Sequence, residues 1–215
     1  MPTEHRFFAA VWDRMIATSE RGGLADMRAE TVGQASGRTL ELGAGTGNNV
    51  AYYTGDVSEL VLTEPDPHMA KRLRKRLADD PPVPPAVEVV ETSAESLPFE
   101  DASFDCVVST LVLCSVEDPE AVARELRRVL KPGGRLLYLE HVRDPDEGGL
   151  ARWQDRLERP WGWLGAGCHP NRPTERTLTD AGFATETTLD SFPKGIPLVR
   201  PADPRRGQFA AAVSG

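Results

Sequence analysis

The sequence predicts an α/β fold in which a mostly parallel sheet carries helices on both faces. Short apolar strands alternate with amphipathic helices along the middle of the chain, an order typical of right-handed βαβ units. A glycine-rich turn, ELGAGTGNN, follows the first of these strands. A length of 215 residues suits one domain, so we expect a single seven-stranded sheet that spans residues 1–215 with additions at its ends.

Residues 1–36 are predicted to form two cap helices. Apolar residues recur at spacings of three and four from Phe7 to Ile16, which favours a helix. Gly22 and Gly23 interrupt this pattern, and residues 24–35 resume it.

The regular alternation occupies residues 38–142. The predicted strands are 39–42, 59–63, 86–91, 104–109 and 135–141. The predicted helices are 49–53, 67–78 and 119–130. The last helix stops at Lys-Pro-Gly-Gly, because proline cannot continue a helix and glycine tolerates the positive φ that ends one.

The alternation pauses after His141. Residues 144–172 are rich in Trp, Gly, Arg and Pro, and we interpret them as a lid insertion. Residues 174–215 are predicted to close the sheet with a helix at 174–181 and strands at 183–189 and 208–213.

Composition excludes several classes of protein. The formal net charge of −8 argues against nucleic acid as a partner. The most apolar window, 107–116, is too short for a bilayer, which needs about 20 apolar residues, so no stable membrane insertion is expected. The N-terminus lacks the features of a signal peptide, and three scattered cysteines suit neither a disulfide framework nor a zinc site. We therefore expect a cytoplasmic protein.

The turn after the first strand contains Gly43, Gly45 and Gly47. Glycine permits a tight turn and a close approach of ligand to backbone, and free N–H groups ahead of a helix would attract a carboxylate or phosphate. The spacing is G-x-G-x-G. A dinucleotide-binding turn would place its third glycine where Asn48 stands, and the lysine of a P-loop is also missing.

Two further segments complete the pattern of an adenosyl-binding site. Glu64 ends the second strand, 21 residues after Gly43, where an acid accepts hydrogen bonds from both ribose hydroxyls. The segment SAESLPF, residues 93–99, follows the third strand and offers backbone groups to an adenine edge. The ordered set predicts a nucleoside cofactor more specifically than the glycines alone.

The chain resembles class I S-adenosylmethionine-dependent methyltransferases of the UbiE and methyltransferase type 11 kind. The segments that carry the resemblance, over residues 38–142, are ELGAGTG, TEPDPHM, SAESLPF, SFDCVVSTLVLCSV and ELRRVLKPGGRLLYLEHV. TLVLCSV, LEHV, GCHPNRPTERTL, AGF and the tryptophans of a W-x(7)-W segment are similar to microsomal alkyl-thiol S-methyltransferases and their bacterial relatives. The hydrophobic N-terminal anchor of the animal members is not seen, so we do not expect their lipid association.

The resemblance implies a Rossmann-like class I methyltransferase fold, S-adenosyl-L-methionine as cofactor and S-adenosyl-L-homocysteine as product. By position, the methionine part would be surrounded by Glu41, Gly43, Ala44, Gly45, Thr46 and Asn48. Glu64 would hold the ribose, and the adenine would contact Pro65, Met69, Ser93, Ala94 and Glu95. Thr110 and Leu111 would lie beside the reacting methyl group. Many relatives have cysteine at the position of Ala44 and aspartate at that of Glu64, and both changes are compatible with cofactor binding.

Methyl transfer from a sulfonium needs no metal, and the acceptor decides whether a base is needed. A small lipophilic thiol is the leading acceptor, because a thiol of pKa about 8.5 is already partly ionised at pH 7. His141, at the end of the fifth strand, is the candidate base, and its alternative role is structural. Cys114 would either line the pocket or only fill space, and Cys168 would lie either in a lid that contacts the substrate or in a surface loop. Six aromatic residues would either wall the acceptor site or pack the insertion and the N-terminal helices against the sheet: Phe7, Phe8, Trp12, Trp153, Trp161 and Trp163.

Other functions stay open at this point. One is N-, O- or C-methylation of a lipid headgroup, a quinone-like ring or a natural product. A nicotinamide oxidoreductase is disfavoured by Asn48, and arsenic methylation by the expected place of Cys106 inside a strand. A module that binds the cofactor without turnover is a further alternative. The basic run 71–76 is interpreted as a solvated helix face, and the oligomeric state is not determined by the sequence.

Overall fold

The computed structural model describes residues 17, 19–141, 152, 154–156, 158, 168–169, 171–191 and 209–214. The predicted first cap helix and most of the lid insertion lie outside these residues. So do the aromatic residues proposed as walls of the acceptor site, which are Phe7, Phe8, Trp12, Trp153, Trp161 and Trp163.

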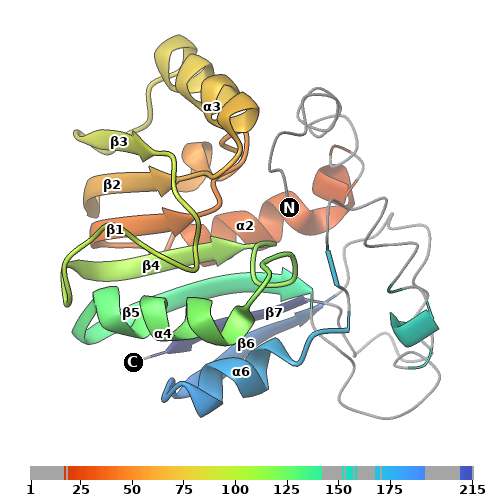
Figure 1. Cartoon of the computed structure of the whole chain (residues 1–215). Helices are drawn as coiled ribbons and strands as arrows, with labels where there is room; N and C mark the ends of the chain where they lie inside the picture. Colours follow the sequence, from red (N-terminus) through yellow and green to blue (C-terminus); the bar gives the residue numbers. More distant parts are fainter. Residues whose placement is uncertain are drawn as a thin grey trace.

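The described strands form one sheet in the order β3-β2-β1-β4-β5-β7-β6 (Figure 1). Five strands are parallel neighbours: β1 (Gly37–Leu42), β2 (Val57–Thr63), β3 (Val87–Val90), β4 (Phe104–Thr110) and β5 (Leu130–His141). Two strands, β6 (Thr185–Ser191) and β7 (Phe209–Ser214), complete the sheet, and β7 runs antiparallel to both β5 and β6. The prediction of a mostly parallel α/β sheet of the Rossmann-like kind is confirmed.

The strand order changes direction between β1 and β4. The chain winds outward from β1 through β2 to β3 and then returns to place β4 on the other side of β1. Ligands of such sheets bind at the carboxyl ends of the strands beside this switch point. The topology alone therefore places the site at the tips of β1, β2 and β4.

Two helices begin where the sequence predicts, because each has a complete start signal. In α3 (Pro67–Asp79), Asp66 Oδ1 accepts hydrogen bonds from the N–H groups of His68 and Met69 at 2.7 and 3.1 Å. In α4 (Pro119–Val129), Asp118 Oδ1 accepts from the Ala121 N–H at 2.8 Å. In both helices a proline follows the capping aspartate, where its missing N–H costs no hydrogen bond.

One predicted helix and the start of one predicted strand need correction. The predicted helix 49–53 is only a three-residue 3₁₀ turn, η2 (Val50–Tyr52), because Tyr53 already has extended backbone. Gly22 and Gly23 interrupt the helical pattern as expected: Gly23, within η1 (Glu20–Leu24), has non-helical backbone at φ 117°, and α2 (Ala25–Val32) follows this kink. The Lys-Pro-Gly-Gly segment follows the end of α4 at Val129, also as expected, but it lies within β5, which begins at Leu130 rather than at residue 135, as a bulge where the pairing with β4 shifts register.

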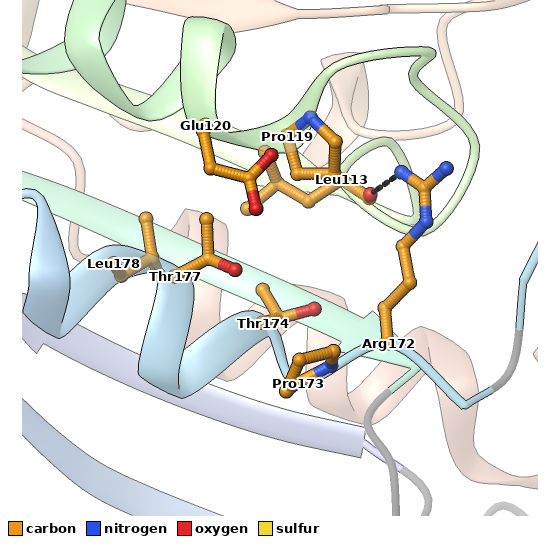
Figure 2. Close-up of a pocket in the computed structure, with 8 residues that line it drawn as sticks. All are labelled: Leu113, Pro119, Glu120, Arg172, Pro173, Thr174, Thr177 and Leu178. Atoms are coloured by element: carbon orange, nitrogen blue, oxygen red, sulfur yellow. Dashed lines mark hydrogen bonds between the residues drawn. The ribbon is translucent and has the colours of Figure 1, made fainter.

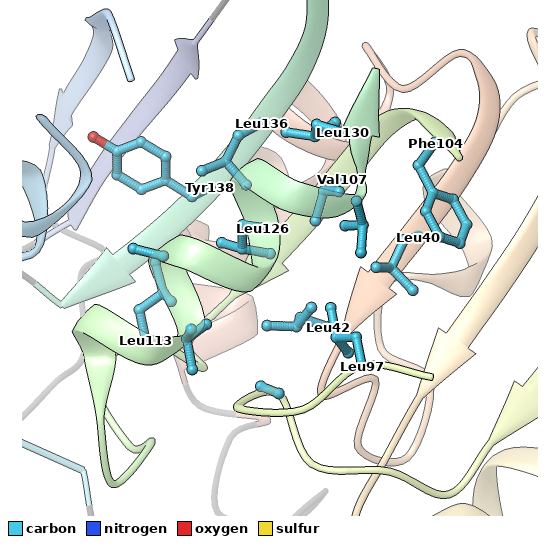
Figure 3. Packing of buried hydrophobic residues seen from close by; sticks show 14 of the residues in the cluster. Leu40, Leu42, Leu97, Phe104, Val107, Leu113, Leu126, Leu130, Leu136 and Tyr138 are labelled. Atoms are coloured by element: carbon cyan, nitrogen blue, oxygen red, sulfur yellow. The ribbon is translucent and has the colours of Figure 1, made fainter. Parts of the chain in front are cut away.

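The sheet is buried on both faces, as parallel sheets are. On one face, α4 and α6 (Thr174–Asp180) cover a cluster that includes Leu40, Val107 and Leu136 (Figure 3). On the other face, Leu60, Val108 and Leu137 belong to a second cluster, with residues of α2 and α3. None of the described helices is long and apolar enough to cross a bilayer.

Candidate functional site

The glycine turn lies at the tip of β1, between the tips of β2 and β4. Its backbone is tied to β2 by hydrogen bonds from Ala44 N–H to the Thr63 carbonyl and from Gly45 N–H to Glu64 Oε2, both at 2.8 Å. Gly47 N–H donates to the Ala44 carbonyl at 2.9 Å. These three N–H groups, which were expected to be free for a ligand, therefore fix the shape of the turn, and only the short turn η2 follows in place of the expected helix 49–53.

Gly43 and Gly45 have the same backbone conformation but different surroundings. Both lie in the left-handed region, at φ 54° and 59°. A Cβ added to Gly43 would lie 2.8 Å from the Val112 side chain, whereas one added to Gly45 would meet nothing within 4 Å. Gly43 is thus required for packing, and Gly45 leaves an open approach to the backbone. That approach suits the amino-acid tail of the expected cofactor.

Glu64 joins the turn to the start of α3. Its Oε2 accepts from Gly45 N–H and its Oε1 accepts from Asp66 N–H at 2.9 Å. Burial raises the pKa of Glu64 to about 7, although these two backbone donors favour the charged form. A carboxylate at this position, with lone pairs beyond the two already used, is chemically suited to accept hydrogen bonds from ribose hydroxyls.

Glu41 lies deeper, inside a buried polar network. Its side chain accepts hydrogen bonds from Tyr53 Oη at 2.5 Å and from Asn49 Nδ2 at 2.9 Å. Asn49 Nδ2 also donates to Thr110 Oγ1 at 2.7 Å, which connects the tips of β1 and β4. Only 1% of Glu41 is exposed, and burial raises its pKa to about 7. Glu41 therefore positions its neighbours from within the protein, and Asn49 connects it to Thr110 at the tip of β4.

Arg28 brings α2 to the same network and was missed by the sequence analysis. Its Nη1 donates to Asn49 Oδ1 at 2.8 Å and to Thr110 Oγ1 at 3.0 Å, and its Nε pairs with Glu20 at 2.9 Å. The residue is 3% exposed, so a positive charge is held at the tip of β4. No motif could have identified Arg28, because an arginine in a predicted helix is normally interpreted as a surface residue.

The two asparagines after the turn have different surroundings. Asn48 accepts a hydrogen bond from Arg76 Nη1 of α3 at 3.1 Å, and its predicted contact with the methionine part of the cofactor stays a prediction. Asn49 is the buried asparagine of the site. Thr46 is also buried, and its carbonyl accepts from Arg76 at 3.2 Å. A one-residue difference of this kind is decided by the turn geometry.

The residues predicted around the adenine lie at the ends of β2 and β3. Met69 is buried on the first turn of α3, Pro65 is exposed just before it, and Ala94 is buried after β3. The carboxylate of Glu95 is bonded to the Ser93 hydroxyl and to the Glu117 N–H. Burial would raise the pKa of Glu95, but these hydrogen bonds outweigh it and lower the pKa. Contact of these five residues with adenine stays a prediction.

Glu140 shapes the loop after β4 and is a second residue that the sequence analysis missed. Its Oε1 accepts at 2.9 Å from Ser109 Oγ and from the N–H groups of Val112 and Leu113, and its Oε2 accepts at 3.3 Å from Cys114 N–H. Glu140 is fully buried, and burial raises its pKa. An acid near the end of an otherwise apolar strand, in LLYLEH, is the signal that could have identified it.

The same loop contains Leu111, at φ 60°, whose N–H donates to the Leu139 carbonyl at 2.8 Å. A leucine in the left-handed region costs of order 1–3 kcal/mol, and the surrounding hydrogen bonds must hold it there. His141 follows Glu140 in β5 and pairs through its backbone with Phe209, but its side chain lies outside the described set. Its role as a base therefore stays a prediction.

A cavity of about 140 Å³ opens at this end of the sheet, between α4 and α6 (Figure 2). Its lining residues are Leu113, Pro119, Glu120, Arg172, Pro173, Thr174, Thr177 and Leu178. Arg172 Nη1 donates to the Leu113 carbonyl at 2.8 Å, and this bond joins the cavity wall to the loop that Glu140 holds. A volume of this size takes a group about as large as benzene. Among the described residues, no group of three or more His, Cys, Asp or Glu side chains is placed to hold a metal ion.

Comparisons with known proteins agree with this geometry. Residues 40–138 match the model of a family described as "Methyltransferase domain". The chain is 40% identical over 152 residues to human thiol S-methyltransferase TMT1B, covering 70% of this chain and 62% of that protein. It is 30% identical over 177 residues to human thiol S-methyltransferase TMT1A, covering 82% of this chain and 72% of that protein. The chain thus spans about three fifths of the length of TMT1B.

A solved structure with nearly the same extent is that of an S-adenosylmethionine-dependent methyltransferase from Thermotoga maritima, described as a possible histamine N-methyltransferase. It matches with a TM-score of 0.69 and 25% identity, over 97% of this chain and 96% of that chain. The likeness extends across the described sheet, beyond the segment that the family model covers.

Proposed function

The chain belongs to the family of class I S-adenosylmethionine-dependent methyltransferases, and from this premise we propose that it methylates a small lipophilic thiol. The observation that carries the proposal is the pair formed by the Gly45 N–H and the Glu64 carboxylate, 2.8 Å apart at the tips of β1 and β2. Open space beside Gly45 leaves room for a ligand against this pair.

Three groups of this chain suit the three parts of the cofactor. Glu64 would accept hydrogen bonds from the ribose hydroxyls, because its carboxylate lies at the tip of β2 beside the turn. Arg28 would offset the charge of the carboxylate on the amino-acid tail, since its guanidinium is buried next to Thr110. Met69 and Ala94 would give the adenine an apolar surface.

The cofactor supplies an electrophilic methyl group on a sulfonium, so the protein has mainly to align the acceptor and exclude water. The loop after β4 is suited to both tasks. Glu140 fixes the backbone of Val112, Leu113 and Cys114, and Leu113 forms a wall of the 140 Å³ cavity. A rigid loop between cofactor and cavity would hold the acceptor in line with the methyl group.

A thiol is the acceptor that needs the least help from the chain. Thiols with a pKa near 8.5 are a few per cent ionised at pH 7, and the thiolate is strongly nucleophilic. The cavity beside the loop has an apolar wall formed by Leu113, Pro119, Pro173 and Leu178, which suits an alkyl or aromatic group. The names of the TMT1A and TMT1B relatives support the same acceptor class.

His141 is the candidate group for taking the acceptor proton, because it ends β5 directly after Glu140. The variant His141→Ala should lower kcat/KM by about 100-fold if the histidine acts as a base. A rate that stays within twofold of the parent protein, with unchanged affinity for S-adenosylhomocysteine, would assign His141 a structural role.

The cofactor half of the proposal is tested by calorimetric titration with S-adenosylhomocysteine. We expect binding in the micromolar range and a clear loss in Glu64→Gln. Absence of binding to the folded protein would contradict the proposal that this chain uses S-adenosylmethionine.

The acceptor half is tested with radiolabelled S-adenosylmethionine and matched acceptors that differ only in the reacting atom. Benzenethiol, phenol and aniline form one set, and hexanethiol, hexanol and hexylamine form another. We expect label in the thiols. Label in the phenol or the amines would favour O- or N-methylation, and cofactor binding without label in any acceptor would favour a module that binds without turnover.

We also propose a cytoplasmic location without a nucleic-acid partner. The support is compositional: the net charge is −8, and three scattered cysteines do not suit the disulfide framework of a secreted protein. Fractionation of cells that express the tagged full chain measures the location.

A further inference from the structure

Two cysteines that are 54 residues apart in the chain lie in contact, and one of them, Cys114, directly follows Leu113 of the cavity wall. The Sγ atoms of Cys114 and Cys168 are 3.4 Å apart, and both residues are buried, with 1% and 6% exposed. Neither belongs to the cofactor turn. We propose that Cys114 and Cys168 form a dithiol oxidation site, which exchanges with small disulfides and closes to an intramolecular disulfide.

The backbone around the pair is held from both sides. Cys114 donates its N–H to Glu140 at 3.3 Å, and its carbonyl accepts from His169 N–H, the residue after Cys168, at 2.7 Å. Arg172 makes a further bond to the Leu113 carbonyl. These bonds fix the two segments next to each other, so little conformational entropy is lost when the sulfurs join. A disulfide has a length of about 2.05 Å, so the sulfurs need to approach by about 1.4 Å.

The third thiol is an internal control. Cys106 lies within β4, is 2% exposed, and burial raises its pKa to about 11. Its side chain faces the second core cluster, which also contains Val108 and Leu137, rather than the cavity. With a pKa of about 11 this thiol is almost entirely neutral at pH 7, and a neutral thiol is a poor nucleophile, so a small disulfide should not react with Cys106 in the folded protein.

The chemistry balances with a low-molecular-weight disulfide, RSSR, as the oxidant. Cys168, the more exposed of the two, loses its proton and attacks one sulfur of RSSR, which forms a mixed disulfide and releases RS⁻. Cys114 then loses its proton and attacks the Cys168 sulfur, which forms the protein disulfide and releases the second RS⁻. The two RS⁻ take up the two protons, so the protein loses two electrons and RSSR becomes two RSH.

This site deepens the proposed function and rests on it in one respect: RSH belongs to the class of acceptors proposed above, and RSSR is its oxidised form. Oxidation would tie the loop after β4, which carries Leu113, to the segment that carries Arg172, and both line the cavity. The pair would thus couple the shape of the cavity to the oxidation state of the thiol pool.

The test measures thiols and needs no methyl transfer, so it stands apart from the acceptor experiment. The full chain is equilibrated with mixtures of 2-mercaptoethanol and its disulfide, quenched with acid, denatured and titrated with a thiol reagent. We expect the count to fall from three thiols to one. Intact mass should fall by about 2 Da with no mercaptoethanol adduct, and a peptide map should link Cys114 to Cys168.

Three variants and one reference sharpen the result. Cys106→Ser should still close the disulfide, whereas Cys114→Ser and Cys168→Ser should stop at a single mixed-disulfide adduct or remain unmodified. In the folded protein, half-oxidation should require at least about tenfold less disulfide than in the urea-denatured chain, because the fold raises the effective concentration of the second thiol. Three thiols at every ratio, a link to Cys106, disulfide-bonded dimers, or equal behaviour in urea would each overturn the proposal.

Discussion

Glu41 and Glu64 show how neighbouring carboxylates acquire different roles from their surroundings. Burial raises the pKa of both to about 7. Glu41 is bonded to the side chains of Tyr53 and Asn49 within the protein, whereas Glu64 is bonded to two backbone N–H groups at the edge of the turn. The carboxylate that faces the backbone at the strand tip is the one suited to a ligand.

For Glu64 we predict an affinity for S-adenosylhomocysteine that rises with pH. Ribose hydroxyls donate to the ionised carboxylate, so binding at a pH below the pKa of about 7 must first release a proton. The affinity should increase up to about tenfold between pH 6 and 8 and level off above pH 8, measured by calorimetry.

The isosteric variant Glu64→Gln should bind about 10- to 100-fold more weakly at pH 8, because an amide is a poorer acceptor than a carboxylate. Its affinity should lose most of the pH dependence. Asp56→Asn, at an exposed position before β2, is the control and should leave both properties unchanged. A pH profile in Glu64→Gln equal to that of the parent protein would exclude Glu64 as its source.

At the scale of elements, loops rather than helices shape the site. The turn after β1 is fixed by bonds to β2, and the loop after β4 is fixed by Glu140 from β5. Each loop is therefore held by the strand next to it in the sheet. This arrangement explains why the site residues come from segments far apart in the chain.

The glycines of the turn permit a matched comparison. Gly43→Ala should lower the free energy of unfolding by about 2–4 kcal/mol, because its Cβ would lie 2.8 Å from Val112. Gly45→Ala has no such contact and should lower stability by only about 1 kcal/mol through its φ of 59°, yet it should weaken S-adenosylhomocysteine binding. Urea unfolding and calorimetry separate the two effects.

Gly133→Ala is the control for backbone strain alone. Gly133 has φ 77°, open space around its missing Cβ and a place in the β5 bulge away from the strand tips. The Gly133→Ala variant should lose about as much stability as Gly45→Ala and keep its affinity for S-adenosylhomocysteine. An unchanged affinity in Gly45→Ala would contradict the placement of the cofactor against the turn.

For Glu140→Gln we predict a loss of turnover that exceeds the loss of cofactor affinity. The loop N–H groups donate hydrogen bonds to the carboxylate of Glu140. In the glutamine variant the NH₂ group is itself a donor, so it cannot accept from these N–H groups and the loop must shift. With an acceptor found active in the panel, kcat should fall about 10- to 100-fold, while the affinity for S-adenosylhomocysteine should change less than fivefold.

Asp105→Asn is the matched control for Glu140→Gln. Asp105 accepts from the Arg38 N–H and from Lys131 at the opposite end of β4, so the variant makes the same carboxylate-to-amide change at a hydrogen-bonded acid far from the site. Its kcat should stay near that of the parent protein. Equal losses of kcat in both variants would indicate general destabilisation rather than a positioning role for Glu140.

At the scale of the whole molecule, the sheet order decides what the site contains. Because β1 lies between β2 and β4, three strand tips meet at one place, and α2 crosses to the same place with Arg28. The cost is that several carboxylates are buried together at this end of the sheet. Global stability should therefore respond to their titration.

We predict that Glu41 makes the fold less stable as the pH rises. Its pKa is raised from 4.5 to about 7 on folding, so between these values the folded protein binds the extra proton. The stabilisation is present below about pH 4.5 and is lost as the pH rises through 7, by up to about 3 kcal/mol. The free energy of unfolding of the parent protein relative to Glu41→Gln, measured in urea from pH 5 to 8, should fall by an amount of this order. A difference that stays constant across this range would exclude the titration of Glu41.

Much of the fold was predictable from local patterns. The starts of α3 and α4 follow from Asp-Pro pairs whose aspartates cap the helices, and the parallel sheet follows from buried strands that alternate with helices. The segment 49–53 was predicted incorrectly as a helix, because the backbone is already extended at Tyr53 and only one short turn forms before it. The interruption at Gly22–Gly23 was predicted correctly, because glycine tolerates the positive φ that Gly23 adopts at the kink.

The sequence by itself determined the class of the protein and the places of the turn and of Glu64, since short-range spacing encodes a strand, a glycine turn and an acid. Only the tertiary structure decided that Asn49 rather than Asn48 is buried at the site, that Arg28 reaches the tip of β4, and that Cys114 contacts Cys168. These contacts join residues up to 82 positions apart in the chain. Side-chain chemistry at such separations is set by strand order and packing, which no local pattern records.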